Sequence, residues 1–208
     1  MGAITVALFA AGDLVGQGTA ERATGSDPRG AAEQLPDLVQ ALLGALPRFE
    51  RPQRVVVGDG PGSFTGLRTA AAFAKGMAHG GAIPMLAVPS LALLVGEAIE
   101  AGSQAADGEA IVGLDALRGE WYVQSFRCVA GQLREAGARR REPATSLPPT
   151  VVGPGRGRDH APHARAFGRC LVVTRPVDSA MWEPDYGRLA EATVQRAVRE
   201  AQAAAREP

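Results

Sequence analysis

The segment from Val55 to Ala78 most constrains the fold, because it spells a strand, a tight turn and a helix in direct succession. The β-branched residues 55–57 predict a short buried strand, and the glycines and proline of 58–62 predict the turn. After Ser63, apolar residues recur every three or four positions, which is typical of one face of a helix. These residues are Phe64, Leu67, Ala71, Ala74 and Ala78. A strand that enters a helix through such a turn presents backbone N–H groups to an anion or to another chain.

Strands and helices alternate along the rest of the chain, and this order predicts an α/β fold with a mixed sheet. The expected strands are residues 4–8 and 14–19, which form a hairpin, and 85–88, 111–114, 121–126 and 171–173. The expected helices are residues 31–46 and 90–99, with a final helix from residue 185 onward.

The motif GPGSFTGLR at residues 60–68 resembles the bacterial TsaB family, also called YeaZ. The likeness continues at AKGMA (74–78), IP (83–84) and VPSL (88–91), and at the segment GLDALRGEWY (113–122). TsaB is the catalytically inactive paralogue of TsaD, the enzyme that makes N6-threonylcarbamoyladenosine in tRNA. The motifs occur in the family's order, and the likeness weakens after about residue 142.

The resemblance implies a two-lobed fold of the actin-like, sugar-kinase-like type. We expect the first lobe at residues 1–102 and a smaller second lobe at 103–208. Family members usually begin with a strand that ends in Asp-Thr, whereas residues 4–8 match the family's second strand directly. Without that opening strand, neighbouring strand edges are expected to be unpaired and apolar faces uncovered. A misassigned translation start or a shortened chain would explain the difference.

The resemblance also implies a role as a non-catalytic scaffold. Such a protein would pair with TsaD and, with the ATPase TsaE, support transfer of threonylcarbamoyl onto the adenosine beside the tRNA anticodon. It would touch tRNA only indirectly. Two alternatives stay open, namely a glycoprotease-like or ATPase enzyme of the same superfamily, and a stand-alone regulatory homodimer.

The residues that could carry catalysis lack partners in the sequence. Asp59 and Asp115 each follow a strand and are interpreted as turn-stabilising carboxylates rather than as general bases. Ser63 does not lie in a G-x-S-x-G elbow and is interpreted as a helix N-cap. His160 and His163 form an H-x-x-H pair without a third ligand in view, so we expect no metal site. No catalytic residue and no cofactor are therefore predicted.

The glycine-rich turn is a candidate phosphate-binding site. Gly60, Gly62 and Ser63 precede the helix and would be the contacts. A lysine at the spacing of a P-loop is missing from the sequence, which argues against ATP binding by this chain alone.

The helices at 31–46 and 63–77 are the expected partner-binding surface. The first carries a broad apolar stripe, and the second is rich in alanine and glycine, which permits close backbone approach. TsaB members use these two helices to bundle with the matching pair of TsaD, or with themselves when alone. The predicted contacts are Leu35, Leu38, Leu42, Phe64, Gly66, Arg68, Ala70, Ala74 and Lys75. Arg68 and Lys75 would pair with acidic residues of a partner or face water; both interpretations stay open.

The composition is consistent with an indirect role toward tRNA. The 22 basic and 22 acidic residues give a net charge of zero, whereas a protein that binds tRNA by itself usually has a basic face. The only basic run, Arg139 to Arg141, is interpreted as a solvated segment beside a strand. Cys128 and Cys170 are too few and too distant for a metal knuckle. With neither a secretory signal nor a membrane span evident, we expect a cytoplasmic protein.

Overall fold

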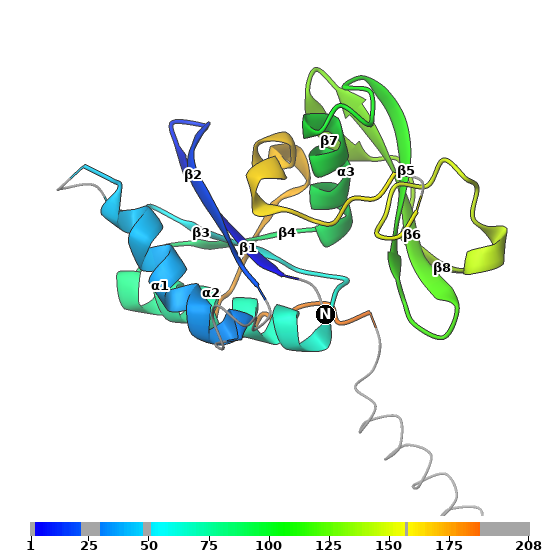
Figure 1. The fold of residues 1–208 in the computed structure, drawn as a ribbon. Coiled ribbons are helices and arrows are strands. Elements are labelled where there is room, and N and C mark those ends of the chain that lie inside the picture. The colour runs from blue at the N-terminus through cyan, green and yellow to red at the C-terminus, as the bar shows by residue number, and fades with distance from the viewer. Residues whose placement is uncertain (1–2, 22–29, 48–50, 157, 188–208) are drawn as a thin grey trace, which may run out of the picture.

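The computed structural model describes residues 3–21, 30–47, 51–156 and 158–187, in which strands and helices alternate as the sequence predicts (Figure 1). The longer helices are α1 (Ala31–Gly44), α2 (Phe64–Gly81) and α3 (Ser90–Glu100). The strands are β1 (Ile4–Ala10), β2 (Asp13–Ala20), β3 (Val55–Gly58), β4 (Met85–Val88), β5 (Gly108–Asp115), β6 (Glu120–Val129), β7 (Gln132–Glu135), β8 (Arg140–Pro143) and β9 (Arg175–Val177). The mixed α/β class is confirmed.

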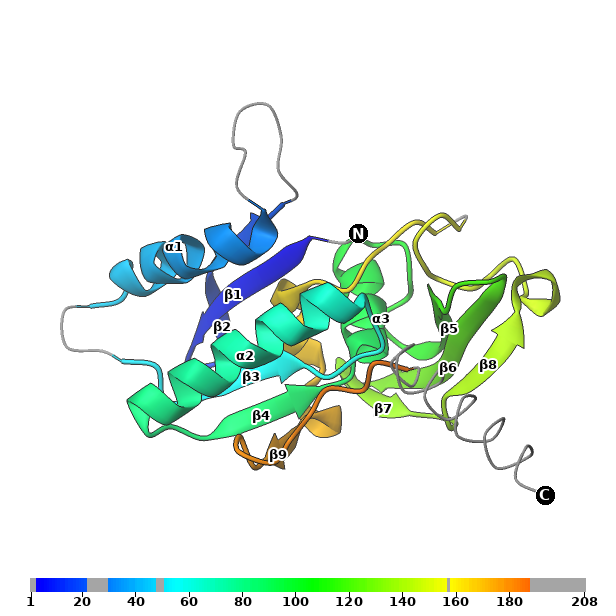
Figure 2. The same cartoon turned by 90° about the horizontal axis from the view of Figure 1, so that it is seen from below.

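Three separate sheets organise these strands. The hairpin β1–β2 forms one, as predicted, and Ala11 and Gly12 make the turn between its strands. In the second sheet, β4 lies in the middle, parallel to β3 and antiparallel to β9. The third sheet is antiparallel, with β6 paired to β5, β7 and β8. Figures 1 and 2 show this third sheet on one side of α3, and the hairpin, β3 and β4 on the other.

Helix α3 forms the core between these two parts. Ten of its eleven residues, from Ser90 to Ile99, are buried, which is typical of a helix that is covered on all sides. Leu91, Leu94 and Val95 pack in one apolar cluster with strand residues of the third sheet. Burial of each such side chain contributes about 1.5–3 kcal/mol to the free energy of unfolding. The helix thereby fixes the position of the third sheet.

The unpaired strand edges that the sequence predicts are confirmed. Within the described residues, β1 pairs only with β2, and β3 pairs only with β4. All seven residues of β1 are only partly buried. A cavity of about 1470 Å³ separates β1 from β3, and both strands line it.

The C-terminal half differs from the sequence prediction, which does not include β7, β8 and β9. Residues 171–173, predicted as a strand, form a 3-10 helix, in which Thr174 Oγ1 donates to the Cys170 carbonyl at 2.7 Å. A short apolar run is ambiguous between strand and helix, and here the strand β9 begins just after it. A longer 3-10 helix, η2 (Ala164–Arg169), packs against α3 and was not predicted. Residues 185–187, predicted as the start of the final helix, are not helical, and the rest of that predicted helix lies outside the described residues. The lobe boundary at residues 102 and 103 stays a prediction.

Candidate functional site

The glycine-rich turn is held between β4 and α3. The Asp59 backbone N–H donates to the Val88 carbonyl at 2.9 Å, so the turn begins as an extension of the β3–β4 pairing. One residue later, the Gly60 carbonyl accepts from the Ser90 backbone N–H, also at 2.9 Å. The peptide bond between Gly60 and Pro61 is cis. The two hydrogen bonds tie the turn to the end of β4 and to the start of α3.

Ser63 caps helix α2, as the sequence predicts. Its Oγ accepts from the Gly66 backbone N–H at 3.2 Å, and its carbonyl accepts from the Leu67 N–H at 2.9 Å. A side chain added at Gly66 would lie 2.7 Å from that Oγ, so the small residue leaves room for the cap. The hydroxyl thus satisfies a free donor at the helix start, which is a structural role.

Residues 178–187, which we call the C-terminal strap, close the turn from the other side. Gly60 has a φ of +104°, and a Cβ at this position would lie 2.0 Å from the Asp185 carbonyl oxygen. The Asp185 N–H donates to the Asp59 carbonyl at 2.6 Å. Gly60 is consequently buried against strap backbone, whereas Gly62 and Ser63 stay exposed. Of the candidate phosphate contacts, only the last two lie at the surface.

The same strap runs along one side of α2. Lys75 Nζ lies 2.8 Å from Glu183 Oε1, and this hydrogen bond lowers the pKa of the Glu183 carboxyl. The rings of Phe64 and Tyr186 meet with centroids 4.8 Å apart. Trp182 is buried in the cluster beneath α2. Lys75 is therefore paired within its own chain, with a carboxylate of the strap rather than with water.

Two ion pairs connect the turn and the strap to Arg175 of β9 and to Arg139, the residue before β8. Asp59 Oδ2 accepts from Arg175 Nη2 at 3.0 Å, and Asp185 pairs with Arg139. Burial raises the pKa of the Asp59 carboxyl, and the Arg175 charge partly offsets this effect. Carboxylate and carbonyl oxygens thus line this side of the turn. Because such oxygens repel an anion, this side of the turn is better suited to a structural role than to phosphate binding.

The three predicted contacts on α1 point largely toward their own chain. Leu35 is buried. The Leu38 and Leu42 side chains lie over the β2 glycines: a Cβ at Gly18 would be 2.3 Å from Leu38 Cδ1, and one at Gly16 would be 2.9 Å from Leu42 Cδ2. These leucines fix α1 on the hairpin, so the outer surface of α1 is formed by other residues.

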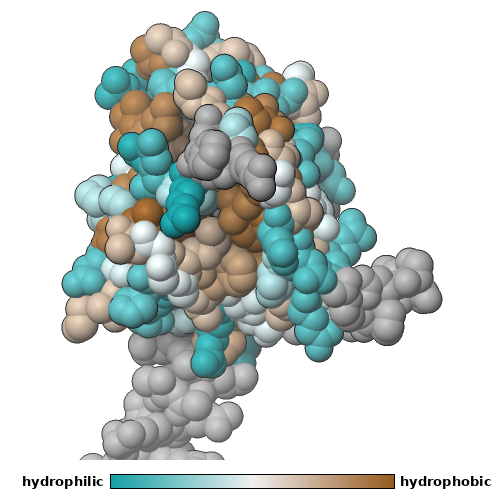
Figure 3. Space-filling view, turned by 90° about the vertical axis from the view of Figure 1, so that its left-hand side faces the viewer, coloured by the Kyte–Doolittle hydropathy of each residue, from teal (hydrophilic) through white to brown (hydrophobic). Residues whose placement is uncertain are grey.

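Helix α2 offers a free face. Its buried residues are Leu67, Ala71, Ala74 and Ala78, so the predicted contact Ala74 packs inward, and Gly66 and Ala70 line the cavity at half-burial. The exposed positions Thr65, Arg68, Ala72 and Gly76 follow one another at intervals of three or four, which places them on one stripe. We call this the α2 stripe. Figure 3 views the molecule from the left-hand side of Figure 1, and there apolar side chains lie near the middle with polar ones around them.

The other candidate catalytic residues do not converge. His160 Nε2 lies 2.6 Å from Ser103 Oγ, whereas His163 Nδ1 accepts from the Arg165 backbone N–H at 3.1 Å. Asp115 Oδ1 accepts from the Leu117 N–H at 2.6 Å, as expected of a turn-stabilising carboxylate. No cluster of three metal-ligating side chains occurs in the part of the chain that the structure describes.

No pattern in the sequence predicts the strap and its ion pairs. Asp59 and Arg175 are separated by 116 residues, and no local pattern reports such a pairing. A signal was present in Trp182 and Tyr186, which are aromatic residues in a segment with little periodicity, in a chain with only 5% aromatic residues. Large aromatic side chains in such a segment usually mark a packing contact.

Comparison with known protein sequences places most of the described site in one family. Residues 27–142 match the family described as TsaD, tRNA N6-adenosine threonylcarbamoyltransferase. An uncharacterised protein of Mycobacterium tuberculosis is 35% identical over 178 residues, which cover 84% of this chain and 75% of the relative. An uncharacterised protein of Mycobacterium leprae is 35% identical over 162 residues, covering 76% of this chain and 40% of that protein.

Solved structures agree in fold. An uncharacterised protein from Pseudomonas aeruginosa, described as similar to the peptidase YEAZ, superimposes with a TM-score of 0.69 at 25% identity, covering 89% of this chain and 94% of the other. YeaZ from Pseudomonas aeruginosa gives the same TM-score at 23% identity, with 88% and 93% covered. The predicted actin-like, sugar-kinase-like fold class is confirmed. Within the described ranges, no helix has the length and apolar character needed to cross a membrane.

Proposed function

The chain belongs to the TsaB (YeaZ) family, and from this premise we propose that it is a non-catalytic scaffold subunit in tRNA threonylcarbamoyladenosine synthesis. In this role it binds the enzyme TsaD and, together with TsaE, supports threonylcarbamoyl transfer onto the adenosine next to the anticodon. Its contribution is to hold the partner's active site in a productive shape and to complete the surface that TsaE recognises.

The observation that carries the proposal is the α2 stripe beside α1. The two helices lie on one face of the hairpin and of the β3–β4 strands (Figures 1 and 2). Ala72 and Gly76 have small side chains, and a Cβ at Gly76 would meet no heavy atom within 4 Å. Small residues let a partner helix approach closely, and two such helices suit a four-helix bundle with the matching pair of a paralogue.

Arg68, at the charged end of the stripe, would set the direction in which the partner's helices lie in the bundle. Arg68 lies over the Phe64 ring, with its guanidinium carbon 5.3 Å from the ring centroid. Phe64 is itself 46% exposed although it is a large aromatic residue. Exposed aromatic and arginine side chains are enriched among the residues that anchor protein interfaces. Among the predicted contacts, Phe64 and Arg68 are thus the two most available to a partner, and Lys75 supports them through the strap.

Several features support a scaffold rather than an enzyme. The Ser63 hydroxyl is used by the helix cap, and the Asp59 carboxylate is used by an ion pair. The glycoprotease-like and ATPase alternatives both need an activated nucleophile, a metal or a phosphate cradle. Binding of a partner to the α2 stripe needs none of these groups, because it depends on surface contact alone.

An indirect relation to tRNA follows from the charges. Arg139, Arg140 and Arg141, the only basic run, pair with Asp185, Glu142 and Glu120 respectively. Neutralised arginines attract phosphate weakly, and phosphate contacts dominate the affinity for nucleic acids. We therefore assign tRNA binding to the partner subunit.

The test is size-exclusion chromatography with light scattering on this chain mixed with the TsaD of the same organism. We expect a one-to-one complex, and we expect Arg68→Glu or Gly76→Glu to weaken it at least tenfold. Arg134→Glu is the matched control, because Arg134 is exposed on β7 in the third sheet. Equal weakening by Arg134→Glu, or self-association that excludes TsaD, would contradict the proposal.

A further inference from the structure

The C-terminal strap follows one side of helix α2. Glu183 of the strap pairs with Lys75 at 2.8 Å. Further along the strap, the Tyr186 ring meets the Phe64 ring with centroids 4.8 Å apart. Phe64 and Lys75 are separated by about three helical turns, so both contacts lie on the same side of α2. Because the later strap residue meets the earlier helix residue, the strap runs antiparallel to α2.

The backbone of the strap is held on both sides of Glu183 and Tyr186. Trp182 is buried in the apolar cluster beneath α2. The Asp185 N–H donates to the Asp59 carbonyl at 2.6 Å, which attaches the strap to the glycine-rich turn. Glu183 directly follows the first of these contacts, and Tyr186 directly follows the second. Their side chains therefore extend from backbone that is fixed in place.

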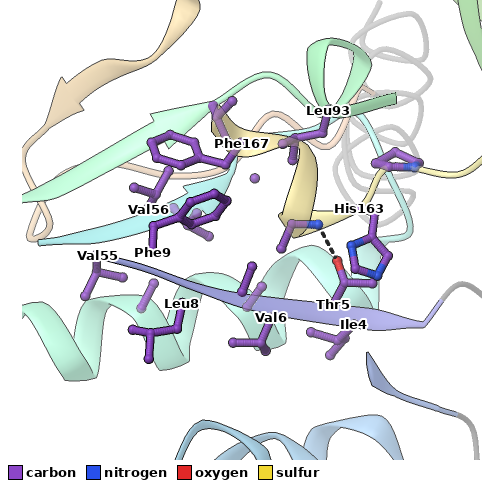
Figure 4. Close-up of a pocket in the computed structure, with 18 of the residues that line it drawn as sticks. Ile4, Thr5, Val6, Leu8, Phe9, Val55, Val56, Leu93, His163 and Phe167 are labelled. Atoms are coloured by element: carbon purple, nitrogen blue, oxygen red, sulfur yellow. Dashed lines mark hydrogen bonds between the residues drawn. The ribbon is translucent and has the colours of Figure 1, made fainter. Parts of the chain in front are cut away.

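The opposite side of α2 faces the cavity between β1 and β3. Gly66 lies two positions after Phe64, about 200° around the helix axis. The cavity-lining residues on this side of α2 are Gly66, Ala70, Phe73 and Met77. Figure 4 looks into this cavity and shows Val6, Leu8 and Val55 among the side chains that line it. The α2 stripe thus lies between the cavity side and the strap.

The strap contacts the two side chains that are most available to a partner. Phe64 is 46% exposed, and the Arg68 guanidinium carbon lies 5.3 Å from the centroid of its ring. Tyr186 packs on the same ring. The hydrogen bond from Lys75 does most to lower the pKa of the Glu183 carboxyl, and Tyr186 and Arg68 act in the same direction. These five side chains therefore form one interacting group beside the stripe.

Such a group changes what it costs a partner to bind. An exposed ring or guanidinium that moves freely must be ordered on binding, and the lost freedom lowers the affinity. Contacts that order Phe64 and Arg68 in the free protein remove part of this cost. The rings of Phe64 and Tyr186 are inclined at 47°, and aromatic pairs favour such arrangements over a face-to-face stack.

We propose that the strap regulates partner binding at the α2 stripe. Tyr186 and Glu183 are positioning residues: they hold Phe64 and Arg68 in the orientation that the partner contacts. Tyr186 acts on the Phe64 ring directly, and Glu183 holds the strap beside α2 through Lys75. This inference rests on the proposed function, because the partner is the TsaD helix pair that is placed on this side of α2.

The test measures the affinity of the full chain for the TsaD of the same organism by biolayer interferometry. Tyr186→Ala should weaken binding about tenfold, because Phe64 and Arg68 must then be ordered on binding. Tyr186→Phe keeps the ring and should stay within about twofold of the unchanged chain. Glu183→Gln alters an exposed ion pair and should weaken binding only about twofold. Val172→Ala, at an exposed apolar position on η3 (Leu171–Val173), is the control and should bind like the unchanged chain.

A double-mutant cycle separates positioning from a general loss of stability. In a chain that carries Phe64→Ala, the further change Tyr186→Ala should weaken binding much less than it does in the unchanged chain, because the ring that it positions is gone. A merely structural role of Tyr186 would instead weaken binding by the same factor in both chains.

Lys75 provides a second measurement that does not need TsaD. It is the only lysine in the sequence, so an amine-reactive acylating reagent reports on its pair with Glu183, with the N-terminal amine as internal reference. Mass spectrometry should show faster acylation of Lys75 in Tyr186→Ala, because the strap is held less firmly, and an unchanged rate in Tyr186→Phe.

The outcomes distinguish failure of this inference from failure of the proposed function. If the unchanged chain binds TsaD and Tyr186→Ala binds equally well, the positioning role is wrong and the scaffold role stands. Tighter binding by Tyr186→Ala would show that the strap competes with the partner, which also overturns the inference. Equal acylation of Lys75 in both chains would show that Tyr186 does not hold the strap. If the unchanged chain does not bind TsaD, the proposed function fails and this inference fails with it.

Discussion

Gly60→Ala is the substitution that most directly probes how the turn, the strap and α2 depend on one another. At a φ of +104°, an alanine is strained by about 1–3 kcal/mol. Its Cβ would also lie 2.0 Å from the Asp185 carbonyl oxygen and 3.0 Å from the carbonyl carbon. Neither atom belongs to a flexible side chain, so the strap must move away from the turn.

Moving the strap removes further stabilising contacts. It loosens Trp182, which is only 8% exposed and whose full burial would contribute about 1.5–3 kcal/mol. If the variant loses half of that burial energy and also carries the backbone strain, the two effects together lower the free energy of unfolding by about 3 kcal/mol. This is a large share of the roughly 5–15 kcal/mol that is typical of a folded domain.

Equilibrium unfolding in urea measures the effect. With a slope of about 2 kcal/mol per molar urea, the midpoint of Gly60→Ala should fall by about 1.5 M. Gly62→Ala is the matched control, since its Cβ would make ordinary contacts at 3.5 Å or more with Leu67. We expect the control to stay within about 1 kcal/mol of the unchanged chain. Equal midpoints for the two variants would refute the reasoning.

The remaining predictions concern charge and burial away from the turn. Arg165→Lys should lower the free energy of unfolding by about 1 kcal/mol, because a lysine cannot form both hydrogen bonds to buried Glu97. As a control, Arg127→Lys alters an exposed ion pair and should change the free energy of unfolding by less than about 0.5 kcal/mol in the same urea titration. Burial raises the pKa of the Cys170 thiol to about 12, so a thiol reagent at pH 8 should modify it at least ~100-fold more slowly in the folded protein than in urea, and equal rates would contradict its burial. Burial also raises the pKa of Asp59, so the folded state holds that proton more tightly than the unfolded state, whose carboxyl titrates near 3.8. As the pH rises from about 3.8 through the folded-state pKa, the unchanged chain should therefore lose stability relative to the Asp59→Asn variant. If the urea midpoints of the two chains show no such change, burial does not raise the pKa of Asp59.

The local part of the fold could be predicted from the sequence because its signals are local. Ser63 caps α2, and Gly12 lies in the hairpin turn, because the residue types required at these positions are specific. The unpaired edges of β1 and β3 were also predictable, since residues 4–8 match the family's second strand.

The strap and its contacts could not be predicted, for a physical reason. Gly60 is explained by the Asp185 carbonyl, more than a hundred residues away, and such a contact leaves no periodic pattern. The short strand β9 follows directly after a 3-10 helix, and three residues are too few to show alternation. On α1, periodicity identified the apolar stripe but not its target, which in the structure is largely the hairpin beneath Leu38 and Leu42.

The most direct test of the scaffold role is the rate of threonylcarbamoyl transfer to tRNA in a reaction reconstituted from TsaD and TsaE of the same organism. The threonylcarbamoyl adenylate is supplied, and this chain is added last. We predict that its addition raises the rate at least tenfold, that Arg68→Glu removes most of this gain, and that the chain alone transfers nothing. An unchanged rate on addition, or transfer by the chain without TsaD, would contradict the account.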